Sequence, residues 1–114
     1  MNLITNAQRE QMLTNGRLTA QGKTIDPHPV VKLFTPDGAA TWLLTELDPG
    51  APDIAFGLCD LGMGSPELGY VSLSELASVR GRFGLAVERD LHFQGDKPLS
   101  AYTAVALKAE AIVT

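Results

Sequence analysis

The middle of the chain alternates short apolar runs with turn sequences, and this pattern constrains the fold more than any other feature. Apolar runs rich in β-forming residues cover residues 30–34, 40–47, 54–61 and 70–73. Glycine, proline and aspartate separate them, in "PDG" at 36–38, "DPGAPD" at 48–53 and "GMGSPELG" at 62–69. Such short connections are typical of antiparallel strands, because parallel strands need a crossover of a dozen residues or more. The sequence therefore predicts an antiparallel sheet.

The N-terminal segment predicts a short polar helix. Thr5 and Gln8 have the spacing of a capping box, in which each side chain bonds a free backbone N–H of the first turn. We expect this helix to run to about Asn15 and to end at Gly16, since glycine is the usual residue just beyond a helix. The segment that follows, residues 17–29, contains two prolines and no sustained period, and predicts a loop.

The C-terminal third predicts a helix, a strand and a helix. Ser72 and Glu75 repeat the capping-box spacing before a short helix that should stop near Gly81 or Gly84. "LAVERDLHF", residues 85–93, alternates apolar and polar positions and predicts a strand. In the last helix, Asp96 is the expected N-cap, and apolar residues recur at helical spacing at Tyr102, Val105, Ala106, Ala109 and Ile112.

Together these elements predict an α+β fold. We expect a single domain over residues 1–114, built as a two-layer sandwich with a mainly antiparallel sheet of four to five strands and two or three helices. A chain of 114 residues with 45% hydrophobic residues is long enough to bury one core without metals or disulfides.

Composition also indicates the cellular compartment in which the protein is expected. One cysteine excludes an internal disulfide, and no stretch reaches the roughly 18 apolar residues that a membrane helix requires. Arg9 and Glu10 interrupt the N-terminus before it could act as a signal peptide. We therefore expect a cytoplasmic protein without membrane association.

Charge is distributed unevenly along the chain. The net charge is −4, but residues 33–79 contain no lysine, arginine or histidine. This segment carries seven acids: Asp37, Glu46, Asp48, Asp53, Asp60, Glu67 and Glu75. Direct nucleic-acid binding is disfavoured, because it depends on clustered basic residues. Two interpretations remain: the acids serve as turn residues and helix caps, or they form a negative surface for a basic partner.

The candidates for catalysis and metal binding are weak. Cys59 and Asp60 are neighbours on an expected strand, so their side chains should point to opposite faces. The two histidines, His28 and His92, match no zinc-binding spacing with the single cysteine, and no calcium-loop spacing is present. Gly62 and Gly64 are explained by a tight turn rather than by a nucleotide-binding loop. We therefore expect no catalytic residues, no metal and no cofactor.

Two aromatic residues lie close in sequence to the acids. On the expected strand 40–47, Trp42, Leu44 and Glu46 should share one face, so that the end near Glu46 emerges from the core. Trp42 and Tyr70 are candidates either for the core or for anchors in a binding surface, where large aromatics are enriched.

Three blocks of the sequence are similar to one family. "HPVVKLFTPDGAATWLLTELDP", "DIAFGLCDLGMGSPELGYVSLSEL" and "ERDLHF" resemble a small bacterial family of unknown function carried by conjugative plasmids, integrative elements and phages. The resemblance extends from Leu3 to about Ala104 and brings no catalytic residues with it. It implies a genetic context of antirestriction and conjugation genes, in which small acidic proteins often occupy the nucleic-acid site of a host defence protein.

These observations lead to two ranked hypotheses. The first is a non-enzymatic interaction protein of a mobile element that modulates or inhibits a host defence or nucleic-acid-handling complex, by binding a host protein with a basic surface. The expected partner-binding residues are Trp42, Glu46, Asp48, Asp53, Asp60, Glu67 and Tyr70. The alternative is a small enzyme or ligand-binding domain with a pocket around residues 58–70, using Asp60 or Glu67 with Cys59 or His92. A homodimer through an uncovered sheet face is a third interpretation.

Overall fold

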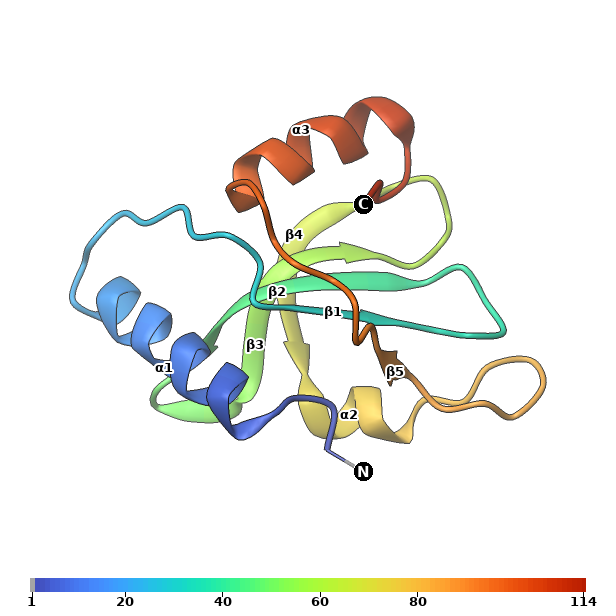
Figure 1. Ribbon diagram of the computed structural model, residues 1–114, viewed down its shortest axis with the longest axis horizontal. Helices are drawn as coiled ribbons and strands as arrows, with labels where there is room; N and C mark the ends of the chain where they lie inside the picture. Colours follow the sequence, from blue (N-terminus) through green and yellow to red (C-terminus); the bar gives the residue numbers. More distant parts are fainter. Residues whose placement is uncertain (1) are drawn as a thin grey trace.

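A computed structural model describes residues 2–114 and shows three helices and one five-stranded sheet (Figure 1). In chain order the elements are α1 (Asn6–Ala20), β1 (Val31–Phe34), β2 (Thr41–Asp48), β3 (Ala51–Asp60), β4 (Glu67–Ser72), α2 (Leu73–Ser78), β5 (Glu88–Arg89) and α3 (Leu99–Ala109). The strand order is β4-β3-β2-β1-β5 with every pairing antiparallel. The predicted α+β class, with a mainly antiparallel sheet, is confirmed.

Helices cover both faces of the sheet. One core cluster joins Met12 of α1 to Trp42 and Leu44 of β2, and a second joins Leu43 of β2 to Tyr102 of α3. Because successive side chains of a strand point to opposite faces, β2 is buried on both sides, and α1 and α3 lie on opposite faces. The layers across the middle of the sheet are therefore helix, sheet and helix, one more than the two layers expected, because β2 is apolar on both faces.

Helix α1 is longer than predicted. The capping box between Thr5 and Gln8 is present, but the helix continues through Gly16 to Ala20. Gly16 is buried against β2, where an added Cβ would lie 1.8 Å from the carbonyl oxygen of Leu47. The glycine is explained by this close approach of helix to strand, so the prediction that it ends the helix was wrong.

Two strands start earlier than predicted. β3 begins at Ala51 and β4 at Glu67, within segments that had been interpreted as turns. In the segment 48–53 the turn is confined to its first residues, where the Asp48 carboxylate accepts a hydrogen bond from the Gly50 N–H at 2.9 Å. This tight turn joins β2 directly to β3, and the two strands form the centre of the sheet.

The segment 85–93 is mostly not a strand. Only Glu88 and Arg89 pair with β1, and Leu85 and Leu91 are exposed. Asp90 ends the pairing, because its carboxylate accepts a hydrogen bond from the His92 N–H at 2.9 Å and turns the chain. The predicted strand over 85–93 is therefore reduced to two residues at the edge of the sheet.

The start of α3 is capped from another part of the chain. The N-cap position is Pro98, which makes no side-chain cap, and Asp96 accepts a hydrogen bond from the Tyr102 hydroxyl at 2.8 Å instead. Asp26, in the loop after α1, accepts from the Ser100 N–H at 3.0 Å and from the Ser100 hydroxyl. The prediction of Asp96 as the N-cap was wrong, because Asp26 supplies that acceptor.

No helix within residues 2–114 combines the length and apolar character needed to cross a lipid bilayer.

Candidate functional site

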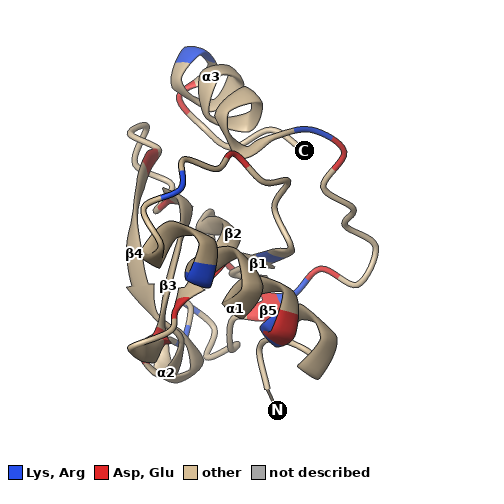
Figure 2. Cartoon of the chain, turned by 90° about the vertical axis from the view of Figure 1, so that its left-hand side faces the viewer, with Lys and Arg blue, Asp and Glu red and all other residues tan. Residues whose placement is uncertain are grey.

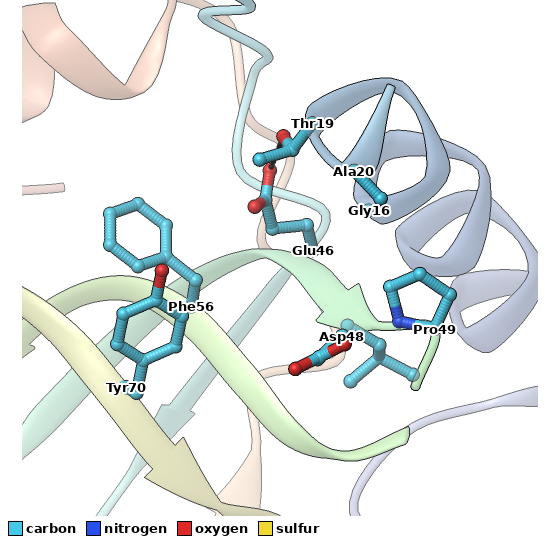
Figure 3. A pocket seen from close by; sticks show the side chains of 9 residues that line it. Gly16, Thr19, Ala20, Glu46, Asp48, Pro49, Phe56 and Tyr70 are labelled. Atoms are coloured by element: carbon cyan, nitrogen blue, oxygen red, sulfur yellow. Dashed lines mark hydrogen bonds between the residues drawn. The ribbon is translucent and has the colours of Figure 1, made fainter. Parts of the chain in front are cut away.

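A small pocket opens where α1 meets the hairpin of β2 and β3 (Figure 3). Its volume is about 160 Å³. It brings together two acids and two aromatic rings from three strands, and we call these four residues the acid–aromatic pocket: Glu46, Asp48, Phe56 and Tyr70. The last turn of α1 forms the opposite wall through Gly16, Thr19 and Ala20. Three of the predicted partner-binding residues thus lie on one surface.

A β-bulge places Glu46 in this pocket. The register between β2 and β3 shifts between Leu44 and Glu46, so that Leu44 faces Gly57 while Glu46 faces Phe56. The extra residue, Thr45, moves Glu46 to the face opposite Trp42. The prediction that Trp42, Leu44 and Glu46 share one face was therefore wrong, and the bulge is the reason that Glu46 lies beside the aromatic rings.

Each of the two acids of the pocket accepts a hydrogen bond from a group of this chain. Glu46 accepts a hydrogen bond from the Thr19 hydroxyl at 3.0 Å, and Asp48 accepts from the Gly50 N–H at 2.9 Å. Across residues 2–114 the structure shows a single ion pair, between Lys32 and Asp90. Neither acid of the pocket is therefore neutralised by a described basic side chain.

The aromatic wall consists of Phe56 and Tyr70 on neighbouring strands. Their ring centroids are 5.0 Å apart with the planes tilted by 57°, a favourable arrangement for an aromatic pair. Phe56 is half-buried, whereas Tyr70 is 69% exposed. Figure 3 shows both rings on one side of the pocket, facing the segment that carries Glu46 and Asp48. The result is an apolar surface beside two carboxylates.

The other predicted acids lie elsewhere. Asp53 and Asp60 are seven residues apart on β3, which at about 3.3 Å per residue separates them by roughly 23 Å. Glu67 pairs with Cys59 near the far end of β3. Figure 2 shows acidic positions on several elements, with basic positions between them. The structure does not gather all five carboxylates on one surface.

Several of these acids stabilise turns and a helix start. Asp53 accepts hydrogen bonds from the hydroxyls of Ser72 and Ser74, at 2.6 and 2.8 Å, which lower the pKa of its carboxyl. Asp60 is buried and accepts from the Gly62 N–H at 2.8 Å and the Ile112 N–H at 3.0 Å. Asp60 thus connects the end of β3 to the residues after α3 and is inaccessible to a partner.

Trp42 is also inaccessible. Its side chain is 4% exposed and belongs to the cluster between the sheet and α1. As an aromatic residue of the sheet it contributes to the core, while Tyr70 alone of the two predicted aromatics lies at the surface.

The pocket proposed around residues 58–70 lacks an activated nucleophile. Burial, followed by the negative charge of Glu67, raises the pKa of the Cys59 thiol to about 11. Its sulfur lies 3.9 and 4.0 Å from the carbonyl oxygens of Gly57 and Gly69. A thiol with a raised pKa is a poor nucleophile at neutral pH, because the thiolate is the reactive form.

Gly62, Gly64 and His92 do not form a site together with Cys59. Gly62 and Gly64 have φ values of 79° and 82° and form the turn between β3 and β4. His92 follows β5, at the opposite edge of the sheet from β4. Within residues 2–114, no three histidine, cysteine, aspartate or glutamate side chains converge in a metal-binding arrangement.

Sequence reasoning missed Phe56 and the end of α1 as parts of the pocket. Phe56 lies in an apolar strand whose pattern does not distinguish a half-buried position from a core position. Thr19 lies beyond the predicted end of the first helix, so the pocket wall formed by α1 was not expected. No local sequence signal indicated this wall, because it depends on the packing of α1 against β2.

Comparison with known proteins identifies a family and no function. The family model described as a protein of unknown function, DUF2958, matches residues 3–113. No curated protein and no solved structure matches the chain significantly. Since the match covers nearly the whole sequence, the chain belongs to the DUF2958 family.

Proposed function

We propose that this protein is a non-enzymatic interaction protein of a mobile genetic element that binds a basic segment of a host defence or nucleic-acid-handling protein. The observation that supports this most is the acid–aromatic pocket, in which Glu46 and Asp48 lie beside the exposed ring of Tyr70 without a basic partner in the described chain. The genetic context is part of the proposal, and its support is the resemblance of three sequence blocks, which implies carriage on mobile elements.

The chemistry of the pocket favours arginine or lysine in an extended segment. A carboxylate forms charge-assisted hydrogen bonds with a guanidinium or ammonium group, and the face of an aromatic ring attracts the same cations. Glu46 supplies the carboxylate and Tyr70 the ring, on the same side of the sheet. A volume of about 160 Å³ accommodates one side chain rather than a large ligand.

The proposal is narrower than the mimicry of a nucleic-acid backbone. A net charge of −4 over 114 residues is modest, and Asp53 and Asp60 serve local structure. Two accessible acids and one aromatic ring fit a short basic segment, because few residues carry most of the energy of an interface.

Affinity capture from a host lysate at low and high salt tests this proposal. We expect the wild-type protein to retain a basic nucleic-acid-binding protein at low salt and to release it at high salt, because screening weakens exposed charge pairs. The double variant Glu46→Lys with Asp48→Lys should lose this capture.

The matched control is Glu10→Lys with Glu88→Lys. Both residues are exposed and lie outside the pocket. Because this variant also replaces two acids by two lysines, it has the same net charge as the first. Capture should persist in the control. Equal loss in the two variants, or equal retention, would reject the pocket as the binding site.

A further inference from the structure

The edge strand β4 has an unpaired outer side. It is the terminal strand of the sheet, and its only strand neighbour is β3. In the described chain, no other backbone-to-backbone hydrogen bond involves its residues. Figure 2 shows β4 along one side of the molecule. A strand in this position presents a row of free N–H and C=O groups to its surroundings.

The two edges of the sheet differ in how they are protected. At one edge, β5 consists only of Glu88 and Arg89, and a short charged strand discourages further pairing. At the other edge, β4 has six residues, contains no proline or lysine, and pairs with β3 in a continuous register without a bulge. Leu68 and Tyr70 on this strand are 47% and 69% exposed. Apart from Glu67 at its first position, β4 therefore lacks the usual features that prevent strand addition.

We propose that β4 pairs with β4 of a second copy of this chain, so that the two sheets join into one antiparallel sheet across a two-fold axis at Gly69. In this register Leu68 lies opposite Tyr70 of the second copy, and Tyr70 lies opposite its Leu68. Glu67 lies opposite Val71, so no like charges meet. The strand is self-complementary, as an isologous interface requires.

Gly69 lies at the axis, where its lack of a side chain allows the two backbones to approach closely. A Cβ added to Gly69 would meet no heavy atom within 4 Å, so nothing inside the molecule requires glycine there. Its φ is not positive either, in contrast to Gly62 and Gly64. Glycine inside a strand weakens the strand and often marks a position where another backbone approaches. Cross-strand pairs of an aromatic and an aliphatic side chain then contribute on both sides of the axis.

The pairing also has a consequence for the acid–aromatic pocket, and this part alone rests on the proposed function. Tyr70 belongs both to β4 and to the pocket. A two-fold axis at Gly69 therefore brings two acid–aromatic pockets onto one face of a continuous sheet. A partner with two basic segments would bind both pockets and gain affinity from the linkage.

Sedimentation equilibrium over a concentration series, up to about 1 mM, tests the pairing. A dimer with a dissociation constant above about 1 mM would have a binding free energy of less than about 4 kcal/mol, too weak to count as the proposed pairing. We expect a monomer–dimer equilibrium in the wild type. Because both copies are negatively charged, dimerisation should strengthen with salt, whereas capture of a basic partner should weaken. The opposite salt dependence separates the two proposals.

The variant Gly69→Lys should remain monomeric, because it places two lysines directly opposite each other at the axis. Leu91→Lys is the matched control: Leu91 is 76% exposed in the segment that follows β5, at the opposite edge of the sheet from β4, and its replacement adds the same charge there. The control should dimerise like the wild type. Circular dichroism should show that both variants are folded.

Hydrogen exchange provides the second measurement. In the wild type, amides on the outer side of β4 should exchange more slowly at high protein concentration. In Gly69→Lys, the exchange rates of the same amides should not depend on protein concentration. A wild type that is monomeric throughout the series, or a dimer that survives Gly69→Lys, would overturn the proposal.

Discussion

At the scale of single residues, most acids of the 33–79 segment are accounted for by local structure. Asp37 docks one loop onto another, since its carboxylate accepts hydrogen bonds from the Phe83 N–H at 2.7 Å and the Leu85 N–H at 3.3 Å. Asp60 joins two segments in the same way. Sequence reasoning offered this interpretation beside the binding surface, and could not sort the acids, because a turn acid and a surface acid have the same local sequence.

Gly16 gives a prediction on stability. Alanine normally stabilises a helix relative to glycine by roughly 0.5–1 kcal/mol. At Gly16 the added Cβ would clash with the Leu47 carbonyl oxygen, so Gly16→Ala should instead destabilise the fold by about 2 kcal/mol.

Urea unfolding measures this change in the free energy of unfolding. Gly69→Ala is the control, because a Cβ there has open space, and its stability should stay close to the wild-type value. A Gly16→Ala variant more stable than the wild type would show that α1 does not pack closely on β2.

Cys59 gives a prediction on reactivity that bears on the enzyme hypothesis. Its pKa is raised to about 11 by burial and by Glu67, so little thiolate exists near pH 8. The thiol should react with a disulfide reagent about tenfold or more slowly than a free cysteine. The same protein unfolded in urea should react at the ordinary rate. Fast reaction of the native protein would contradict this account and favour a nucleophilic role.

At the scale of elements, the hairpins were predictable and the edges were not. The turns at 36–38 and 62–66 separate antiparallel strands, as predicted, because turn chemistry and apolar runs are local signals. The strand predicted over 85–93 has a good alternating pattern, yet it pairs with only the last two residues of β1. A strand extends only where a partner strand lies beside it, and that partner is not visible in the strand's own sequence.

The bulge in β2 shows the same limit for the site. Thr45 shifts the register with β3 and moves Glu46 to the face of Phe56. A shift of one residue reverses which face every later side chain occupies. The sequence was enough to propose Glu46, Asp48 and Tyr70 as site residues. It was not enough to place Glu46 and Tyr70 on one face, because that depends on a bulge that no local pattern predicted.

The start of α3 gives a prediction on pH dependence. Hydrogen bonds from the side chain and the backbone of Ser100 lower the pKa of Asp26 below its ordinary value of 3.8. A lowered pKa in the folded state means that the stabilisation is present above the ordinary value and is lost as the pH falls through the folded pKa.

Asp26→Ala should therefore lower stability by about 1 kcal/mol at neutral pH, as expected for loss of a helix cap. The difference between variant and wild type should shrink as the pH falls from about 5 to 2. Thermal unfolding at several pH values measures this. A difference that is constant with pH would show that the Asp26 charge does not cap α3.

At the scale of the whole molecule, the fold class followed from the sequence, but the proposed interaction surface needed the structure. An antiparallel sheet with helices is confirmed. The acidic segment is one block in sequence, yet β-strands carry its members to both faces and both ends of the sheet. Among these acids, Glu46 and Asp48 are the two that lie beside the rings of Phe56 and Tyr70, in the acid–aromatic pocket.

Titration of isotope-labelled protein with a short peptide rich in arginine and lysine, followed by two-dimensional NMR, tests the central claim most directly. We predict that amide shifts change around Glu46, Asp48, Phe56 and Tyr70. These changes should be absent in Glu46→Gln with Asp48→Asn and should persist in Glu10→Gln with Glu88→Gln. Shift changes spread evenly over all exposed acids, or unaltered in the pocket variant, would contradict the account.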